Sequence, residues 1–398
     1  MEFHISDKMG SVQGSIIREL FKLASDPNMI AFGGGNPSPD SFPTADIARI
    51  AAEALQNDAV SMLQYGLSEG YPPLRETMKR HLSRIEGIPF DGNNELFILS
   101  GGQQCADLLS KVLLNEGDTV LTESPSFVGC LNTFRSYGAH LVGIPMEPDG
   151  MDLNALEQAL KSEKNIRFLY TIPSFQNPTG FTTSAEKRKK IYELAQHYNI
   201  LIFEDNPYGE IRFSGEHLAP IKALDVDGRV LYAGSFSKTM APAFRLGFLA
   251  FDAALSSRLA VAKQCTDVHS TTLFQYICNE YMTTCDYAGH IAHTCALYRA
   301  KSGLMLGEMK KRFHPDVTFN PPEGGLFVMA FLPEGIDSYP FVQEGIRRGV
   351  ATVPGVAFAV DTAQPHNGIR LNYSSPSDEN IVKGIDILGA LTHEWLAR

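Results

Sequence analysis

Short apolar runs and amphipathic segments alternate between residues 96 and 251 of the chain. A short apolar run is typical of a buried strand, whereas apolar residues that recur every three or four positions indicate a helix packed on one side. Predicted strands cover 96–99, 119–121, 140–144, 166–170, 200–203, 230–233 and 247–251, and predicted helices cover 103–114, 126–137, 152–161 and 184–198. This alternation predicts an α/β domain whose central sheet is mostly parallel, of a seven-stranded type, and flanked by helices.

The last of these runs, 247–251, follows its predecessor too closely for a crossover helix, so we expect it to run antiparallel. The chain then becomes helical, with one long helix predicted at 287–313. Shorter strand and helix patterns follow and end in a helix at 378–395, which together indicate a small α+β module. The expected organisation is an N-terminal segment or lid that joins the small domain (1–43), a large domain (44–286) and a small C-terminal domain (287–398).

Composition narrows the possible partners. The 398 residues are 44% hydrophobic and 20% charged, which is ordinary for a globular enzyme. The net charge of −11 argues against a nucleic-acid or anionic membrane partner, because both are themselves negative. No segment reads as a membrane span or as a secretory signal, so we expect a cytoplasmic protein. The six cysteines form no Cys-x-x-Cys pair and have no histidines at zinc spacing, so no metal site is predicted.

Candidate chemistry begins at the end of the predicted strand 230–233. Ser235, Ser237 and Lys238 follow that strand, and Arg245 comes seven positions after the lysine. A lysine amine can form a Schiff base with a carbonyl, and hydroxyls beside a guanidinium can hold a phosphate. Pyridoxal phosphate is both an aldehyde and a phosphate ester, so it fits this combination. A solvated polar turn after a strand is the competing interpretation of these residues when they are taken alone.

Other predicted strands also end in polar or aromatic residues, and ligands of parallel sheets bind at the carboxyl ends of the strands. Residues 100–104, Ser-Gly-Gly-Gln-Gln, open a helix and could bind an anion with backbone N–H groups. Asn177 lies in a Pro/Gly turn, and Asp205 with Tyr208 follows the strand 200–203. A carboxylate at this strand end, in the pair Glu204-Asp205, could pair with a protonated pyridine nitrogen, which makes the ring an electron sink. Phe127 could stack on the same ring. A helix start, a turn asparagine, a capping carboxylate, a core tyrosine and a core phenylalanine are the structural alternatives.

Taken together, these motifs resemble the fold-type-I, pyridoxal-phosphate-dependent class I and II aminotransferases. The most similar members are the kynurenine/α-aminoadipate aminotransferase group, which also includes aromatic and branched-chain enzymes. The resemblance runs from Arg18 to Arg370 and is most specific at three motifs: Ser235-x-Ser-Lys238 with Arg245-Leu-Gly, Asn177-Pro-Thr-Gly, and Asp205-x-x-Tyr208.

The resemblance implies a role for each matching residue. Lys238 would be the Schiff-base lysine, Asp205 the partner of the ring nitrogen, and Asn177 and Tyr208 the partners of the phenolic oxygen. The implied phosphate ligands are Gly102, Gln103, Ser235, Ser237 and Arg245. Phe127 stands where many relatives carry tyrosine, and Gly102 stands where they often carry serine or alanine. Stacking at Phe127 and a backbone contact at Gly102 are therefore all that the resemblance implies there.

Further residues are implied to bind the substrate or to come from a second subunit. Arg370 matches the arginine that pairs with the substrate α-carboxylate, and Gly35 matches a residue that lines the substrate pocket. Arg18 belongs to a segment similar to a substrate lid and could meet a distal carboxylate, or it could be a surface charge. Tyr65 matches a tyrosine that reaches the phosphate of the neighbouring subunit. The resemblance therefore implies a homodimer with shared active sites.

The implied reaction is transamination, in which the amino group of an L-amino acid passes to a 2-oxo acid such as 2-oxoglutarate. Aromatic, branched-chain and aminoadipate-type donors all remain open. One alternative on the same scaffold is a pyridoxal-phosphate-dependent β-lyase that acts on cysteine conjugates. A second is the cofactor-binding effector domain of a transcription regulator, but only about thirty residues precede the glycine loop at residue 33, where such regulators carry a winged-helix module.

Overall fold

The computed structural model describes residues 3–10 and 29–397. Its largest sheet has the order β2-β9-β8-β7-β6-β3-β4-β5. The bounds of these strands are β2 (Asn94–Leu99), β3 (Thr119–Ser124), β4 (His140–Glu147), β5 (Gly150–Met151), β6 (Ile166–Thr171), β7 (Leu201–Asp205), β8 (Val230–Ser235) and β9 (Gly247–Asp252). All pairs are parallel except those of β9 with β2 and β8 and that of β5 with β4. The mostly parallel sheet and the antiparallel β9 are thus confirmed, and the two-residue β5 extends the seven longer strands.

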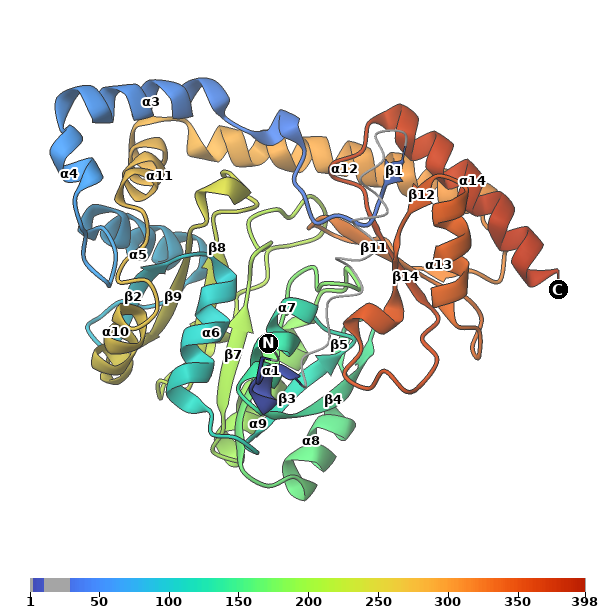
Figure 1. The fold of residues 1–398 in the computed structure, drawn as a ribbon, viewed down its shortest axis with the longest axis horizontal. Helices are drawn as coiled ribbons and strands as arrows, with labels where there is room; N and C mark the ends of the chain where they lie inside the picture. The colour runs from blue at the N-terminus through green and yellow to red at the C-terminus, as the bar shows by residue number, and fades with distance from the viewer. Residues whose placement is uncertain (1–2, 11–28, 398) are drawn as a thin grey trace.

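Helices cover both faces of this sheet (Figure 1). One face packs against α6 (Gly102–Leu113), α7 (Val128–Ser136) and α10 (Ser256–Gln264). The other face packs against α5 (Pro72–Glu86), α8 (Leu153–Ser162), α9 (Ala185–His197) and α11 (Thr272–Thr284). Two outer helices, α3 (Thr44–Asn57) and α4 (Ala59–Leu63), lie against α11. Burial on both faces explains why the strands read as continuous apolar runs rather than as alternating ones.

A second, antiparallel sheet has the order β10-β11-β14-β13 and a core of its own. Its strands are β10 (Thr318–Phe319), β11 (Phe327–Phe331), β13 (Val353–Pro354) and β14 (Gly368–Asn372), and its helices are α12 (Tyr287–Arg312), α13 (Ser338–Arg347) and α14 (Asp378–Leu396). The segment before α3 contributes β1 (Ile30–Ala31), which pairs in parallel with β12 (Val350–Ala351). The long helix α12 spans the top of the molecule from α11 to α14 (Figure 1). The exact domain boundaries stay a prediction.

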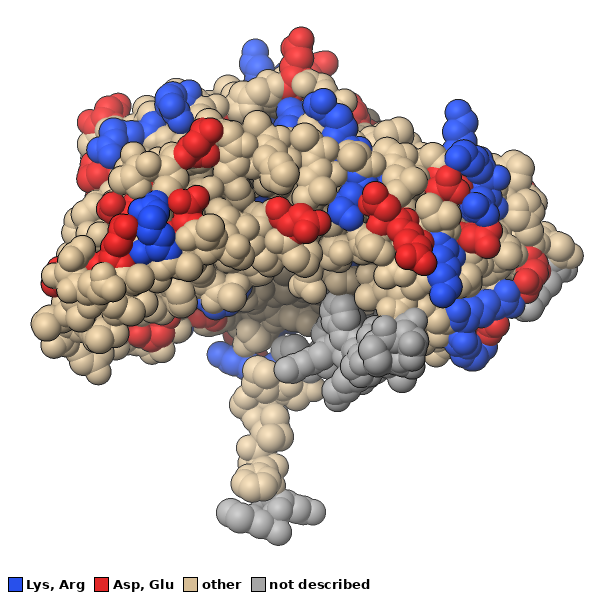
Figure 2. Space-filling view, turned by 90° about the horizontal axis from the view of Figure 1, so that it is seen from above, with Lys and Arg blue, Asp and Glu red and all other residues tan. Residues whose placement is uncertain are grey.

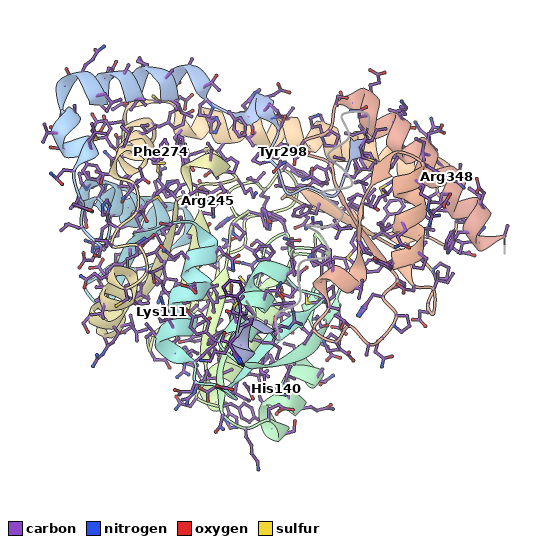
Figure 3. The ribbon with its side chains drawn as sticks, in the orientation of Figure 1. Lys111, His140, Arg245, Phe274, Tyr298 and Arg348 are labelled. Carbon is purple, nitrogen blue, oxygen red and sulfur yellow. The ribbon has the colours of Figure 1, made fainter. Side chains whose placement is uncertain are left out.

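The carboxyl ends of the parallel strands point toward the second sheet. In Figure 3, Arg245, which follows β8, lies at this upper end, whereas His140, at the start of β4, lies at the opposite end of the sheet. Figure 2 shows acidic and basic side chains interspersed over the face seen from above. Within the described residues, no helix combines the length and the apolar character that crossing a membrane requires.

Candidate active site

A cavity of about 360 Å³ opens where the strands of the large sheet end. Every predicted site residue that the structure describes, except Tyr65, lines it: Gly35, Gly102, Gln103, Phe127, Asn177, Asp205, Tyr208, Ser235, Ser237, Lys238, Arg245 and Arg370. The topology explains this gathering, because β3, β6, β7 and β8 are parallel and their following loops meet at one edge. Residues up to 335 positions apart in sequence are therefore brought around one space.

Lys238 lies in the turn after β8 with its amine at the wall of the cavity. Its Nζ donates a hydrogen bond to the backbone oxygen of Gly35 at 2.7 Å. Burial, together with the positive charges of Arg245 and Arg370, lowers the pKa of this amine to about 8. A lysine with a pKa near 8 supplies a neutral amine close to physiological pH, which is the form that attacks a carbonyl.

Asp205 ends β7 and is the acidic residue among those that line the cavity. Its carboxyl is buried and accepts a hydrogen bond on Oδ2 from the Tyr170 hydroxyl at 2.8 Å. Burial raises the pKa of this carboxyl to about 7, and the Tyr170 hydrogen bond acts against that rise. A buried carboxyl of this kind is ionised most readily when a cation faces it. A protonated ring nitrogen in the cavity would be such a cation.

The first turn of α6 and Arg245 form the end of the cavity that suits a phosphate. Gly102 and Gln103 open α6, whose free N–H groups and dipole attract an anion. Gly101 just before them has φ of 88°, and a Cβ there would lie 2.9 Å from Nη2 of Arg245. Only glycine therefore lets the guanidinium come this close to the loop. The Gln103 side chain itself turns to the backbone of Gly129, so its contribution to the cavity is its backbone.

Arg370 in β14 presents its guanidinium from the second sheet. Nη1 donates to Oδ1 of Asn177 at 2.8 Å and Nη2 donates to the backbone oxygen of Gly33 at 2.6 Å, while Nε has no hydrogen-bond partner. The rings of Phe327 and Phe358 lie 4.2 Å and 4.7 Å from the guanidinium carbon. Burial lowers the pKa of Arg370 to about 10. These contacts fix the plane of the guanidinium. Its remaining N–H groups stay free to bind a carboxylate.

Positive charge exceeds negative charge in the cavity, and this imbalance tests whether the cofactor fits. Lys238, Arg245 and Arg370 direct their hydrogen bonds to neutral oxygens, namely Gly35 O, Pro242 O, Asn177 Oδ1 and Gly33 O. None of the three forms an ion pair with a carboxylate in the part of the chain that the structure describes. A phosphate at Arg245 and a carboxylate at Arg370 would balance them, and the Asp205 carboxyl suits a pyridinium. These residues fit pyridoxal phosphate with an amino-acid substrate.

One predicted residue that the structure describes, Tyr65, lies outside the cavity. Tyr65 is 82% exposed, contacts His269 edge-to-face at 5.7 Å and does not line the cavity of its own chain. Its expected contact is with a second subunit, so it stays a prediction. Arg18 lies outside the described residues. Among those residues no group of three or more His, Cys, Asp or Glu side chains is arranged to hold a metal ion.

Some residues of the site were not found from the sequence. Phe327 and Ile172 line the cavity, and Tyr170 bonds Asp205 from behind. Each reads in the sequence as an apolar strand or loop residue, and the pattern carries no signal that separates it from the core. Gly129 also lines the cavity at the start of α7, where a Cβ would lie 2.5 Å from Gln103 Oε1.

Comparisons with known proteins identify the family to which the chain is similar. The family described as aminotransferase class I and II matches residues 27–388 of the chain. An aromatic-amino-acid aminotransferase 1 of Thermococcus litoralis is 38% identical over 100% of this chain and 96% of its own length. A 2-aminoadipate transaminase of Thermus thermophilus is 35% identical over 98% and 96%. The crystal structure of a kynurenine aminotransferase of Pyrococcus horikoshii superposes with a TM-score of 0.95 at 37% identity, covering 98% of this chain and 97% of that one.

Proposed function

The chain belongs to the class I and II aminotransferase family, and from this premise we propose that its cavity moves the amino group of an aromatic, branched-chain or aminoadipate-type L-amino acid to a 2-oxo acid such as 2-oxoglutarate. The protein is an aminotransferase of the pyridoxal-phosphate fold type I, and its cofactor is pyridoxal phosphate. The observation that carries the assignment of the site is that the Lys238 amine, the Asp205 carboxyl and the Arg370 fork line one cavity.

Each end of the cavity has a task in holding the cofactor. When bound, pyridoxal phosphate supplies an aldehyde that condenses with amines and a ring that withdraws electrons while its nitrogen is protonated. Gly102, Gln103, Ser235, Ser237 and Arg245 would hold the phosphate, and Phe127 would stack on the ring. Asp205 would hold the ring nitrogen, and Asn177 and Tyr208 would donate hydrogen bonds to the phenolic oxygen.

Lys238 would act as both nucleophile and proton carrier. Its amine would hold the cofactor, and in its neutral form it would accept the proton from the substrate α-carbon. With a pKa of about 8, roughly a tenth of the free amine is neutral, and therefore basic, at pH 7 and about half at pH 8. The half-buried position of Lys238 limits water around the amine, which strengthens the influence of Arg245 and Arg370.

Arg370 would orient the substrate by pairing with its α-carboxylate. Its hydrogen bond to Asn177 fixes the guanidinium plane, so the α-carbon is held at a defined distance from the Lys238 turn. Apolar side chains at Phe127, Ile172 and Phe327 line the same cavity and suit an apolar substrate side chain. Gly35 leaves room beside Phe327, since a Cβ there would be 3.6 Å from the ring. Arg18, in the predicted lid, is our candidate partner for a distal carboxylate.

We also infer a homodimer in which Tyr65 of one chain completes the site of the other. Tyr65 lies beside other exposed apolar side chains, Val60, Leu63 and Leu67, which form a strip on α4 and the loop after it. Exposed apolar strips of this kind mark protein–protein contacts. The net charge of −11 is compatible with our further expectation that the protein works in the cytoplasm.

Replacement of Lys238 tests this function. K238A should lower turnover in a 2-oxoglutarate-coupled assay by at least about a thousandfold, because general acid–base and covalent catalysis are both removed. K301A is a matched control, since Lys301 is also buried and its Nζ also donates to a backbone oxygen, that of Pro376 at 2.6 Å. Wild-type turnover in K238A would overturn the assignment.

A panel of amino donors would then define the substrate. We expect aromatic, branched-chain and aminoadipate donors to transfer their amino group to 2-oxoglutarate. The β-lyase alternative predicts instead that cysteine conjugates release pyruvate and ammonia with no amino acceptor present. Binding to DNA at physiological salt would favour the regulator alternative over both.

A further inference from the structure

Asp205 is held from behind by one side chain that does not reach the substrate. The hydroxyl of Tyr170 donates to Oδ2 of Asp205 at 2.8 Å, and no other side-chain hydrogen bond to this carboxyl occurs within the described residues. Tyr170 in β6 pairs with Phe203 in β7, and Asp205 lies two residues further on, on the same face of the sheet. A long aromatic side chain can span such a diagonal. Tyr170 is fully buried and does not line the cavity.

The Tyr170 ring is fixed, so the hydroxyl has a defined position. The ring centroids of Phe134 and Phe203 lie 5.4 Å and 5.2 Å away. Because these contacts involve the ring and not the hydroxyl, replacing Tyr170 by phenylalanine removes the donor and keeps the packing.

Among the described residues, Tyr170 is the side chain that hydrogen-bonds the Asp205 carboxyl, whereas the cations of the cavity bond other oxygens. The titratable side chains that interact with it come from α6, α7, β3, β6 and the loop after β7, and they are Cys105, Cys130, Glu123, Tyr170 and Tyr208. None of these is a cation. Burial raises the pKa of Asp205, and the Tyr170 hydroxyl is the group that opposes the rise.

We propose that Tyr170 is a positioning residue that keeps Asp205 ionised and leaves its second oxygen, Oδ1, free for the ring nitrogen of the cofactor. The proposal rests on the proposed function, in which this cavity holds pyridoxal phosphate. When the cofactor binds to protonated Asp205, the carboxyl proton passes to the ring nitrogen. Tyr170 favours that transfer because its hydrogen bond is stronger to the carboxylate than to the neutral acid.

This role has a characteristic pH dependence. Below the pKa of Asp205 the apoprotein carries a neutral acid, so binding must create the carboxylate, and loss of the Tyr170 hydroxyl weakens binding. Above that pKa the carboxylate exists before and after binding, so the lost hydrogen bond cancels. The ratio of wild-type to Y170F affinity should therefore be about tenfold at pH 6, a factor equal to one unit of pKa, and approach one at pH 9.

The experiment is a titration of the apoproteins with pyridoxamine 5′-phosphate, followed by calorimetry at pH 6 to 9. This amine form of the cofactor cannot condense with Lys238, so it reports on the non-covalent contacts alone. Its own protonation is common to all variants and cancels in the ratio. Y192F is the matched control, because the Tyr192 hydroxyl also donates to an aspartate, Asp227, at 3.1 Å. Tyr192 belongs to helix α9, which covers the other face of the sheet. Thermal unfolding of each apoprotein shows whether the variants fold.

The outcomes separate the possibilities. A pH-dependent ratio for Y170F, a ratio near one for Y192F, and no effect of Y170F on top of D205N support the proposal. A wild-type to Y170F affinity ratio that stays near one, or that is raised equally at every pH, overturns the proposal, because the hydroxyl would then be irrelevant or merely structural. Failure of the wild-type apoprotein to bind the probe would instead contradict the proposed function. If Y170F fails to fold, a D205N affinity equal to that of wild type at pH 6 would overturn the proposal, since Tyr170 acts through that carboxylate.

Discussion

Two charged clusters lie on opposite faces of the sheet at the end of β7, and they differ in how their charges are balanced. Glu204 and Asp205 are consecutive, so their side chains point to opposite faces. The closed cluster contains Arg188, Glu204, Lys222 and Asp225, and the open cluster contains Asp205, Lys238, Arg245 and Arg370. Glu204 accepts the backbone N–H groups of Ile221 and Lys222 at 2.8 Å each. Asp205 has Tyr170 as its side-chain donor and faces the cavity.

In the closed cluster the charges of opposite sign balance: Lys222 pairs with Asp225, and Arg188 and Glu204 bond neutral groups but attract each other electrostatically. Lys222 and Asp225 are fully buried and 2.8 Å apart, and Arg188 donates to four backbone oxygens and to the Ser174 hydroxyl. In the open cluster the cations bond neutral oxygens, and Arg370 Nε bonds nothing. The comparison teaches that buried charge alone does not indicate function. Charge that the protein leaves unbalanced beside a cavity indicates a place for ligand charges.

The largest effect should come from the same substitution in each cluster. K222A leaves Asp225 buried and unpaired, so we expect the free energy of unfolding to fall by about 3–5 kcal/mol. K238A removes an amine that has no carboxylate partner in the described structure, so the apoprotein should lose less than about 1 kcal/mol. Urea denaturation of both apoproteins measures the difference. Equal losses would show that the two clusters do not differ as their contacts indicate.

Arginine offers a second comparison of the clusters, with a smaller expected effect. R370L removes the fork that would hold the substrate α-carboxylate, so kcat/KM for the amino donor should fall about tenfold to a hundredfold, the worth of about 1.5–3 kcal/mol for charged hydrogen bonds. R370K should not restore it, because lysine lacks the planar fork. R188L should instead lower the unfolding temperature and leave the KM of the folded fraction near that of wild type. A lower Tm with unchanged kcat/KM in R370L would make Arg370 a structural residue.

The sequence predicted most of the fold because both sheet faces are apolar and the strands therefore stand out between amphipathic helices. Strand ends also located the open cluster, since parallel strands bring their following loops together. What the sequence could not show was which of two adjacent carboxylates faces a cavity. The period of two places Glu204 and Asp205 on opposite faces, but the face that is filled depends on η2 (Ile221–Leu224), which covers Glu204. The family resemblance, not the local pattern, selected Asp205.

The contacts that the sequence missed are those made between distant segments. Tyr170 has the same strand context as its apolar neighbours, and its contact with Asp205 depends on the register of β6 and β7. The orientation of Arg370 depends on Asn177 and Gly33, which are 193 and 337 positions away. The first contact follows from strand register within the large sheet and the second from the packing of the second sheet on the first, and no local signal carries either.

Glu86 differs from the other charges on the closed side of the sheet, because one of its buried oxygens has no hydrogen bond. Its replacement has the smallest effect that we predict. It ends α5 beside the closed cluster, is 5% exposed, and its Oε2 lacks a hydrogen bond although His217 Nε2 lies 3.3 Å away. It also lines a separate cavity of about 790 Å³. Burial raises the pKa of Glu86 to about 8, and the negative charges of Glu210 and Glu204 add to the rise.

A raised carboxyl pKa means that the folded protein holds a proton that the unfolded chain loses above pH 4.5. Stability therefore falls as the pH rises from about 4.5 to 8, and E86Q removes that loss. We expect the free energy of unfolding of E86Q to exceed that of wild type by about 1–2 kcal/mol at pH 8 and by much less at pH 5. This difference is smaller than the free energy that corresponds to the full pKa shift of Glu86. E334Q, at an exposed position, controls for the amide substitution itself. If E86Q is more stable than wild type and its turnover is unchanged, the unbonded oxygen of Glu86 only lowers stability and has no part in function. If turnover falls instead, the closed side of the sheet also takes part in function, and the contrast between the two clusters fails.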